Sequence, residues 1–126
     1  MKNYQTVVNY LKTIDVDVKS ANYTAYVNNG QTKTIFLHHN YNLEKNGLIA
    51  LLHEAGHSLQ PEGEYGPNHY KNVDDMERPK EFMMYQFMNE VDAWNRGLSL
   101  AQELGIEIDK KRWQREMEES LLTYYV

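Results

Sequence analysis

The sequence predicts a single α+β domain in which a small antiparallel sheet packs on one helix, with further helices around it. Three observations lead to this prediction. The 126 residues suit one domain. Apolar residues recur at helical spacing near both ends of the chain. Two β-rich runs flank an Asn-Gly pair between those ends. No internal repeat or linker interrupts the sequence, so we expect one domain over residues 1–126.

The N-terminal part predicts a helix, a strand, a hairpin and a second helix. Residues 3–14 have an amphipathic helical pattern formed by Tyr4, Val7, Val8, Leu11 and Ile14. The run VDVKS that follows predicts a short strand. Residues 22–39 predict a β-hairpin, because Asn29-Gly30 suits a tight turn with positive φ. Residues 44–59 predict a helix that ends before Pro61.

The C-terminal part predicts a long loop and two helices. Prolines and glycines punctuate residues 60–76, and a loop of this length in a small domain is usually functional or disordered. A long helix over residues 77–104 should stop near Gly105. Asp109 should cap a last helix. The apolar stripe of that helix consists of Trp113, Met117 and Leu121.

Composition excludes several classes of function. The net charge is −5, from 13 basic and 18 acidic residues without a basic cluster, which argues against nucleic-acid binding. The absence of cysteine excludes disulfides and thiolate metal sites. The N-terminal segment lacks the apolar core of a signal peptide, and no run approaches the ~18 apolar residues of a membrane span. We therefore expect a cytoplasmic protein with neither a nucleic-acid nor a membrane partner.

The segment LIALLHEAGHSLQPEG predicts a metal site on a helix. His53 and His57 are four residues apart and therefore share one helical face, so both imidazoles can bind one ion. Zinc accepts imidazole nitrogens and keeps one position open for water in catalytic sites. Glu54 is rotated by about 100° and can take a proton from that water without binding the metal, which is the chemistry of the H-E-x-x-H motif. The alternative is a solvated helix face with two chance histidines.

The rest of this helix predicts that one side is buried and that His53 and His57 face something else, such as a cleft. An apolar stripe lies roughly opposite the two histidines and consists of Leu48, Leu52, Ala55 and Leu59. Gly56 costs about 1 kcal/mol relative to alanine in a helix interior. Its presence therefore indicates close backbone packing or crowding near the site.

A catalytic zinc usually has a third protein ligand. The metzincin pattern would require glycine and histidine where this chain has Gln60 and Gly63, and a deformylase-like site would require a cysteine. Glu90 is the candidate, because it lies in the middle of the apolar face of the long helix, where a carboxylate is costly unless it is paired or bound to metal. Asp92 lies on the opposite side and is interpreted as solvated surface. The alternative for Glu90 is a buried salt bridge, to Arg78 or Arg112.

Two motifs together resemble a known family. HEAGH at residues 53–57, followed by NEVDAW at residues 89–94, resembles the gluzincin pattern. It is most similar to compact ImmA/IrrE-type metallopeptidase domains, in which H-E-x-x-H precedes a helix bearing E-x-[DE]-A. The resemblance covers about residues 30–105. It departs from the larger gluzincins at Trp94, where they have aspartate, and no helix-turn-helix accompanies it.

The resemblance implies a zincin-like fold, Zn2+ as cofactor, and a peptide or protein as substrate. It also implies His53, His57 and Glu90 as zinc ligands and Glu54 as general base. By the same resemblance, residues 33–38 would form an edge strand beside the active helix and hold extended substrate by β-addition.

Other polar residues are candidates for contacts with a substrate or a developing oxyanion. Three lie in the long loop and can donate a hydrogen bond, namely Tyr65, His69 and Tyr70. His38 and His39 end a predicted strand and alternate faces, so at most one, taken as His38, points inward. Asp74 and Asp75 are alternative third ligands, although beside Glu77 they fit a charge cluster at a helix start better.

The sequence thus predicts a zinc metallopeptidase that hydrolyses peptide bonds, with Glu54 taking a proton from water and passing it to the leaving amine. One alternative is a non-catalytic, zinc-stabilised binding or regulatory module, and another is a metal-free structural protein. Zinc content separates the last of these from the first two. Turnover that is lost on changing Glu54 separates the enzyme from the binding module.

Overall fold

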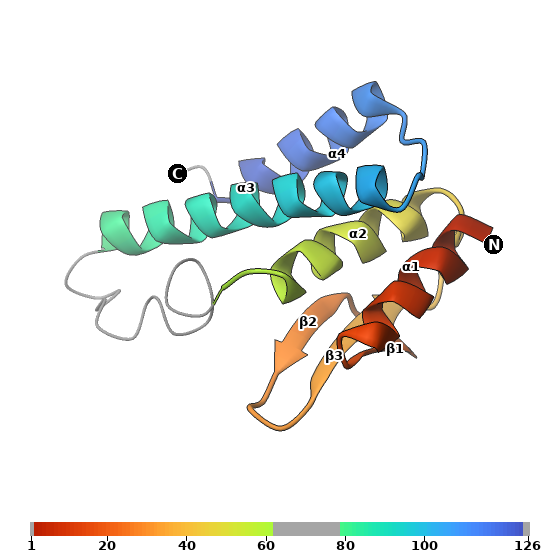
Figure 1. Cartoon of the computed structure of the whole chain (residues 1–126). Coiled ribbons are helices and arrows are strands. Elements are labelled where there is room, and N and C mark those ends of the chain that lie inside the picture. Colours follow the sequence, from red (N-terminus) through yellow and green to blue (C-terminus); the bar gives the residue numbers. More distant parts are fainter. Residues whose placement is uncertain (1, 62–78, 125–126) are drawn as a thin grey trace.

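The computed structural model of the chain describes residues 2–61 and 79–124, and its elements follow the predicted order (Figure 1). The elements are α1 (Lys2–Thr13), β1 (Val16–Ala21), β2 (Ala25–Asn28), β3 (Lys33–His38), α2 (Asn46–Ser58), α3 (Pro79–Glu103) and α4 (Lys110–Leu122). The predicted α+β class is therefore confirmed. Most of the predicted loop at residues 60–76 lies outside the described residues.

Helix α1 is positioned by a contact at its N-terminal end and by its buried face. The carboxylate of Glu44, from the segment before α2, accepts hydrogen bonds from the backbone nitrogens of Asn3 at 3.0 Å and Tyr4 at 2.8 Å. An acidic group at this end is favourable, because the first amides of a helix have no partner within the helix. Val7 and Leu11 of the predicted stripe are fully buried. Helix α1 therefore packs through the face that its sequence pattern indicates.

The sheet is mixed and not antiparallel as predicted. Strand β3 lies in the centre of the order β1-β3-β2, parallel to β1 and antiparallel to β2. Residues 22–24 carry the chain from β1 around the end of β3. There the backbone nitrogen of His39 donates to the carbonyl of Ala21 at 2.9 Å. Because β3 is paired on both edges, the expectation of an edge strand at residues 33–38 that is free to bind substrate is wrong.

The predicted hairpin is confirmed between β2 and β3. Gly30 has a φ of 89°, which favours glycine, as the Asn-Gly pair indicated. The side-chain oxygen of Asn29 accepts hydrogen bonds from the backbone nitrogens of Gln31 at 2.9 Å and Thr32 at 2.7 Å. The turn is therefore stabilised by its own residues.

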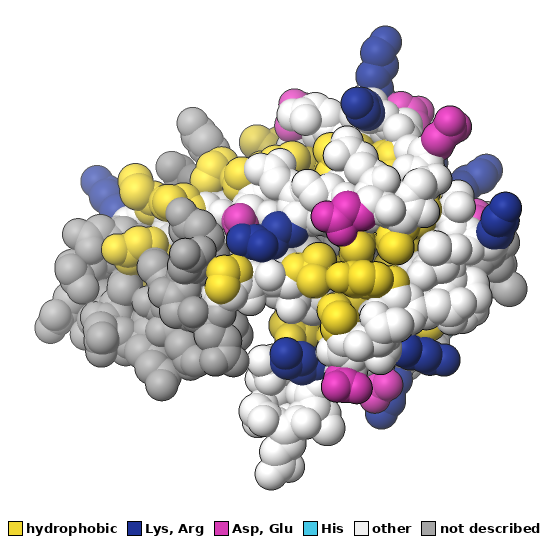
Figure 2. Space-filling model, viewed as in Figure 1, with side chains coloured by type: hydrophobic (Ala, Val, Ile, Leu, Met, Phe, Trp, Pro, Cys, Tyr) yellow, Lys and Arg dark blue, Asp and Glu magenta, His cyan; other side chains and the backbone are white. Residues whose placement is uncertain are grey.

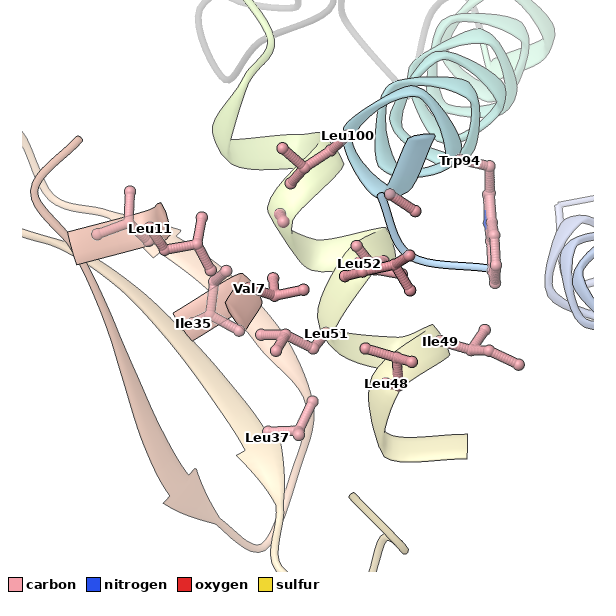
Figure 3. Packing of buried hydrophobic residues seen from close by; sticks show 14 of the residues in the cluster. Val7, Leu11, Ile35, Leu37, Leu48, Ile49, Leu51, Leu52, Trp94 and Leu100 are labelled. Atoms are coloured by element: carbon pink, nitrogen blue, oxygen red, sulfur yellow. The ribbon is translucent and has the colours of Figure 1, made fainter. Parts of the chain in front are cut away.

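Helix α2 lies between the sheet and α3, and eight of its 13 residues are buried (Figures 1 and 3). Leu51 points toward the sheet and is fully buried together with Ile35 of β3 and Val7 of α1 (Figure 3). Leu52 points toward α3, on the side of Leu100 (Figure 3). A helix covered on two sides can hold polar groups only where those groups find partners.

Two glycines bring the backbones of α2 and α3 into contact. A Cβ atom placed on Gly56 would overlap the carbonyl oxygen of Ala93, and one placed on Gly97 would overlap the carbonyl oxygen of Leu52. Close packing at Gly56 was predicted, and it is confirmed. The backbone of α3 is therefore held directly against the turn of α2 that carries the histidines.

The end of α3 and the start of α4 follow the predicted signals. Gly105 has a φ of 71°, and two backbone hydrogen bonds close the helix end, from Gly105 to Gln102 and from Ile106 to Ala101. The side chain of Asp109 caps α4 by accepting from the backbone nitrogens at positions 111 and 112. Trp113 is buried against α3.

On the face shown in Figure 2, acidic and basic side chains are interspersed, and neither kind forms a large patch. No described histidine reaches the surface on that face. Within residues 2–61 and 79–124, no helix is long and apolar enough to cross a membrane.

Candidate metal centre

His53 and His57 lie on one face of α2, with their ring centroids 5.0 Å apart. Helix α3 places Glu90 opposite them. The Oε1 atom of Glu90 is 3.1 Å from Nε2 of His53, and its Oε2 atom is 2.7 Å from Nε2 of His57. Each carboxylate oxygen therefore faces a different histidine, so Glu90 bridges the two rings between the helices.

Glu90 is buried, and the two histidines determine the direction in which the pKa of its carboxyl is shifted. Burial alone raises the pKa of its carboxyl, but the hydrogen bonds and positive charges of His53 and His57 outweigh burial and lower that pKa to about 2. Of the two arginines considered as alternative partners, Arg112 lines a neighbouring cavity and Arg78 lies outside the described residues. The carboxylate thus persists inside the fold because two imidazoles face it.

The contact with Glu90 also shifts the pKa of the His57 imidazole. Burial lowers the pKa of its imidazole, but the hydrogen bond and charge of Glu90, then the charge of Glu54 and a hydrogen bond to Gln60, outweigh burial and raise that pKa above 6.5. The centre therefore favours a positive charge between the carboxylates. A proton on His57 or a divalent cation would supply such a charge.

Glu54 is the second carboxylate that reaches the histidine pair. It is buried in α2, and its Oε2 atom is 3.5 Å from Nδ1 of His53. Donor atoms of His53, Glu54 and His57 all lie within 4.8 Å of one another, so these three could also form a ligand set. Glu90, however, contacts Nε2 of both rings, whereas the close contact of Glu54 is with Nδ1 of His53. Glu90 therefore lies against Nε2 of both rings, and Glu54 lies beside His53.

The donor set fits zinc. Zinc binds imidazole nitrogen and carboxylate oxygen at about 2.0–2.2 Å, so neighbouring ligand atoms of a tetrahedral site are about 3.4 Å apart. The observed separations of 3.1 Å and 2.7 Å are slightly shorter. Small outward movements of the side chains would accommodate the ion. Two histidines with one glutamate form one of the known ligand sets of catalytic zinc.

Trp94 supports the first histidine. Its indole stacks on the ring of His53 with centroids 4.2 Å apart and an angle of 11° between the planes. Trp113 of α4 meets the same indole edge-on at 5.1 Å. The indole nitrogens of both tryptophans lack a hydrogen-bond partner within the described part of the chain. Trp94 thus fixes the plane of His53 by packing.

A cavity of about 480 Å³ lies beside His53, between α2 and α4. Ile49, Ala50 and Trp94 give it an apolar side, and α4 contributes polar residues that include Arg112 and Glu116. His53 lines the cavity, whereas Glu54, His57 and Glu90 do not. Four residues form the centre itself, and their side chains are only 10–14% exposed: His53, Glu54, His57 and Glu90.

Among the remaining sequence candidates, His38 is the one that the described part of the chain includes. Tyr65, His69 and Tyr70, together with Asp74 and Asp75, lie outside the described residues. His38 is described, and its ring contacts His39 and Tyr41 with centroid distances of 4.8 Å and 5.9 Å. Its Nδ1 atom accepts a hydrogen bond from the backbone of Asn40 at 3.1 Å. His38 therefore belongs to the end of β3, whereas Tyr41 lines the cavity.

The interpretation of Asp92 as solvated surface is wrong. Asp92 is half-buried, and its Oδ2 atom accepts hydrogen bonds from Nε of Arg96 at 2.7 Å and from Nε2 of Gln60 at 3.1 Å. Gln60 lies just past the end of α2, and its side chain reaches α3. The side of α3 that carries Asp92 is therefore in contact with the end of α2. The sequence pattern of α3 alone carries no sign of this partner.

Two residues near the centre were missed by sequence reasoning. Gln60 faces Nδ1 of His57 at 3.1 Å, and its spacing of three residues from that histidine was the available signal. Tyr124 follows α4, and burial together with the negative charges of Glu90 and Glu54 raises the pKa of its phenol. No spacing in the sequence connects Tyr124 with α2.

Comparison of the chain with protein-family models, with curated proteins and with solved structures gives no match. Functional inference therefore starts from the geometry of the four central residues.

Proposed function

We propose that this chain is a zinc-dependent peptidase with a zincin-like fold. His53, His57 and Glu90 hold the ion, and Glu54 acts as general base. The observation that carries the proposal is the position of Glu90, because each of its buried oxygens faces Nε2 of a different histidine. An ordinary buried ion pair requires only one partner. Two imidazoles that face one buried carboxylate supply the donor types of a site with two histidines and one carboxylate.

The chemistry follows from the residues around that point. Bound zinc would polarise a peptide carbonyl and lower the pKa of a coordinated water. Glu54 lies beside the histidines on the same helix, where it can accept a proton from the attacking water and later give it to the leaving amine. The cavity beside His53 can receive a substrate side chain during this step. The substrate class is therefore a peptide or an extended segment of a protein.

The family resemblance supports the same assignment. The H-E-x-x-H motif is on α2, the E-x-[DE]-A motif is on α3, and these two helices are in backbone contact. Helix α2 also lies against a sheet, as expected of a zincin-like arrangement. Similarity to the ImmA/IrrE-type domains is part of this proposal.

The alternative is a zinc-stabilised binding or regulatory module without catalysis. One observation favours it, because the four central side chains are only 10–14% exposed. Structural zinc sites are typically closed, whereas catalytic sites keep one position open.

Metal content and turnover test the proposal together. After purification without chelator and reconstitution with zinc, we expect one equivalent of zinc in the wild-type chain and a large loss in His53→Ala. Less than a tenth of an equivalent in the wild type would refute the metal site. Glu54→Gln should keep the zinc and the fold but lose hydrolysis of a peptide mixture by about 10²–10⁴-fold. Zinc without turnover in the wild type would favour the binding module.

A further inference from the structure

One side of α4 forms a polar wall of the cavity beside His53. Four residues of α4, spaced so that they share one side of the helix, line this cavity: Arg112, Glu116, Glu119 and Ser120. The α2 side of the same cavity is apolar, with Ile49 and Ala50 next to His53. The cavity thus combines charged groups from one helix with an apolar surface that adjoins the first proposed zinc ligand.

Arg112 and Glu116 carry opposite charges on the polar wall, four residues apart, and both side chains are half-buried. Within residues 2–61 and 79–124, neither side chain has a hydrogen bond or an ion pair. Glu119 is exposed, so water and salt screen its charge. The wall therefore offers an unpaired set of donors on Arg112 and an unpaired set of acceptors on Glu116, both partly removed from water.

A primary amide matches both of these groups. Its oxygen can accept from the guanidinium of Arg112, and its NH₂ group can donate to the carboxylate of Glu116. A carboxylate in the cavity would face the like charge of Glu116, and an ammonium group would face that of Arg112. An apolar ligand would displace water from both groups without replacing its hydrogen bonds. A neutral group that both donates and accepts is therefore the best complement.

We infer that this cavity is a substrate subsite that selects a glutamine side chain. Its volume of about 480 Å³ accommodates a side chain of that length. The aliphatic part of glutamine would lie along Ile49 and Ala50, and its amide would face Arg112 and Glu116. The role of the subsite in hydrolysis rests on the proposed function, whereas the selection of glutamine rests on the groups that line the cavity.

Peptide binding measures this selectivity without turnover. The probes are blocked alanine pentapeptides in which the central residue is glutamine, glutamate, lysine or methionine. They are titrated into Glu54→Gln after zinc reconstitution, and NMR of the two tryptophan indole N–H groups reports binding, because Trp94 lines the cavity. We expect the glutamine peptide to bind about tenfold more tightly than each of the other three.

Two substitutions on α4, made in the same Glu54→Gln protein, should change the selectivity in opposite directions. Glu116→Gln removes the charge that repels an acid, so the glutamate peptide should gain about tenfold relative to the lysine peptide. Arg112→Gln removes the charge that repels a base, so the lysine peptide should gain by a similar factor. Arg115→Gln and Glu118→Gln remove the same charges at exposed positions outside the cavity and should leave the order of the peptides unchanged.

The outcomes are distinct. Binding of none of the four peptides overturns the inference, as does an order of peptides that neither Glu116→Gln nor Arg112→Gln changes. A preference for lysine that is lost in Glu119→Gln also overturns it, because the cavity would then select a cation. If the wild type neither holds zinc nor cleaves the glutamine peptide, the proposed function fails, but the order of binding still decides the subsite. Circular dichroism checks the fold of each variant, and Arg112→Met replaces Arg112→Gln if the latter does not fold.

Discussion

The two faces of α2 differ in what they require from the sequence. The face toward the sheet presents Leu51, which packs against Ile35 and Val7 without any polar partner (Figure 3). The face toward α3 presents Gly56 and two histidines, which meet a backbone carbonyl and a carboxylate at defined distances. The first face depends on apolar volume, and the second depends on the positions of individual atoms. Stability and metal chemistry can therefore be changed separately within one helix.

The sheet face should yield the largest change in stability. Leu51→Ala removes a fully buried side chain, and such truncations typically cost about 2–5 kcal/mol of unfolding free energy. Zinc affinity of the folded protein should be unchanged, because Leu51 points away from α3. Chemical denaturation in chelator and zinc titration measure the two quantities. A parallel loss of zinc affinity would show that the two faces are not independent.

Glu90→Gln should give the largest change in metal binding. It replaces one of three proposed ligands, and we expect zinc affinity to fall by at least about 100-fold, beyond the usual effect of outer-shell changes. Asp92→Asn is the matched control, since it also removes one negative charge but keeps an oxygen that can accept from Gln60 and Arg96. Zinc titration measures both. Lower stability of Glu90→Gln with unchanged zinc affinity would instead indicate a buried ion pair only.

Gly56→Ala should affect both properties, to a smaller extent. Alanine favours a helix by about 1 kcal/mol over glycine. The added methyl group would overlap the carbonyl of Ala93, so we expect a net loss of about 1–3 kcal/mol and weaker zinc binding as α3 moves away. Thermal melts with and without zinc measure the effect, with Ser99→Ala on the exposed side of α3 as control. A stabilised Gly56→Ala would contradict the close approach.

The smallest expected effect is a pH window for the stability of the metal-free protein. The pKa of Glu90 is lowered from 4.5 to about 2, so its contribution is present above pH 4.5 and is lost as the pH falls toward 2. The pKa of His57 is raised above 6.5, so its contribution is complete below 6.5 and is lost as the pH rises through the raised value. The pair should therefore stabilise the fold most between about pH 4.5 and 6.5.

Melts in chelator at a series of pH values measure this window. The profile of Glu90→Gln should be flatter than that of the wild type on both sides. Identical profiles for the two proteins would mean that the contact between Glu90 and the histidines contributes nothing to the metal-free fold.

Features that depend on neighbouring residues could be predicted from the sequence. The pattern of Val7 and Leu11 on one helical face, the turn at Gly30, the cap at Asp109 and the stop at Gly105 all follow from residues that are close together in the sequence. The position of Glu90 could be predicted for a similar reason. A carboxylate inside an apolar helical stripe requires a partner, and the histidines of α2 were the available groups.

Features that depend on the identity of a distant partner could not be predicted. Alternation along β3 indicates which of its side chains are buried, but it does not indicate which neighbours occupy the two edges of the strand. Asp92 lies on the side of α3 that the helical wheel indicates as polar, and only the tertiary position of Gln60 makes it part of the centre. A single helical pattern contains no information on such a contact.

The strand order also has a consequence for the order in which the chain folds. Strands β1 and β2 follow each other in the sequence, but β3 lies between them. The hairpin of β2 and β3 can close early, because Asn28 and Lys33 pair across a short turn, whereas Val16 of β1 pairs with the same Lys33 across a longer loop. During synthesis β1 therefore leaves the ribosome without a strand partner. We expect it to complete the sheet only after the later hairpin has formed.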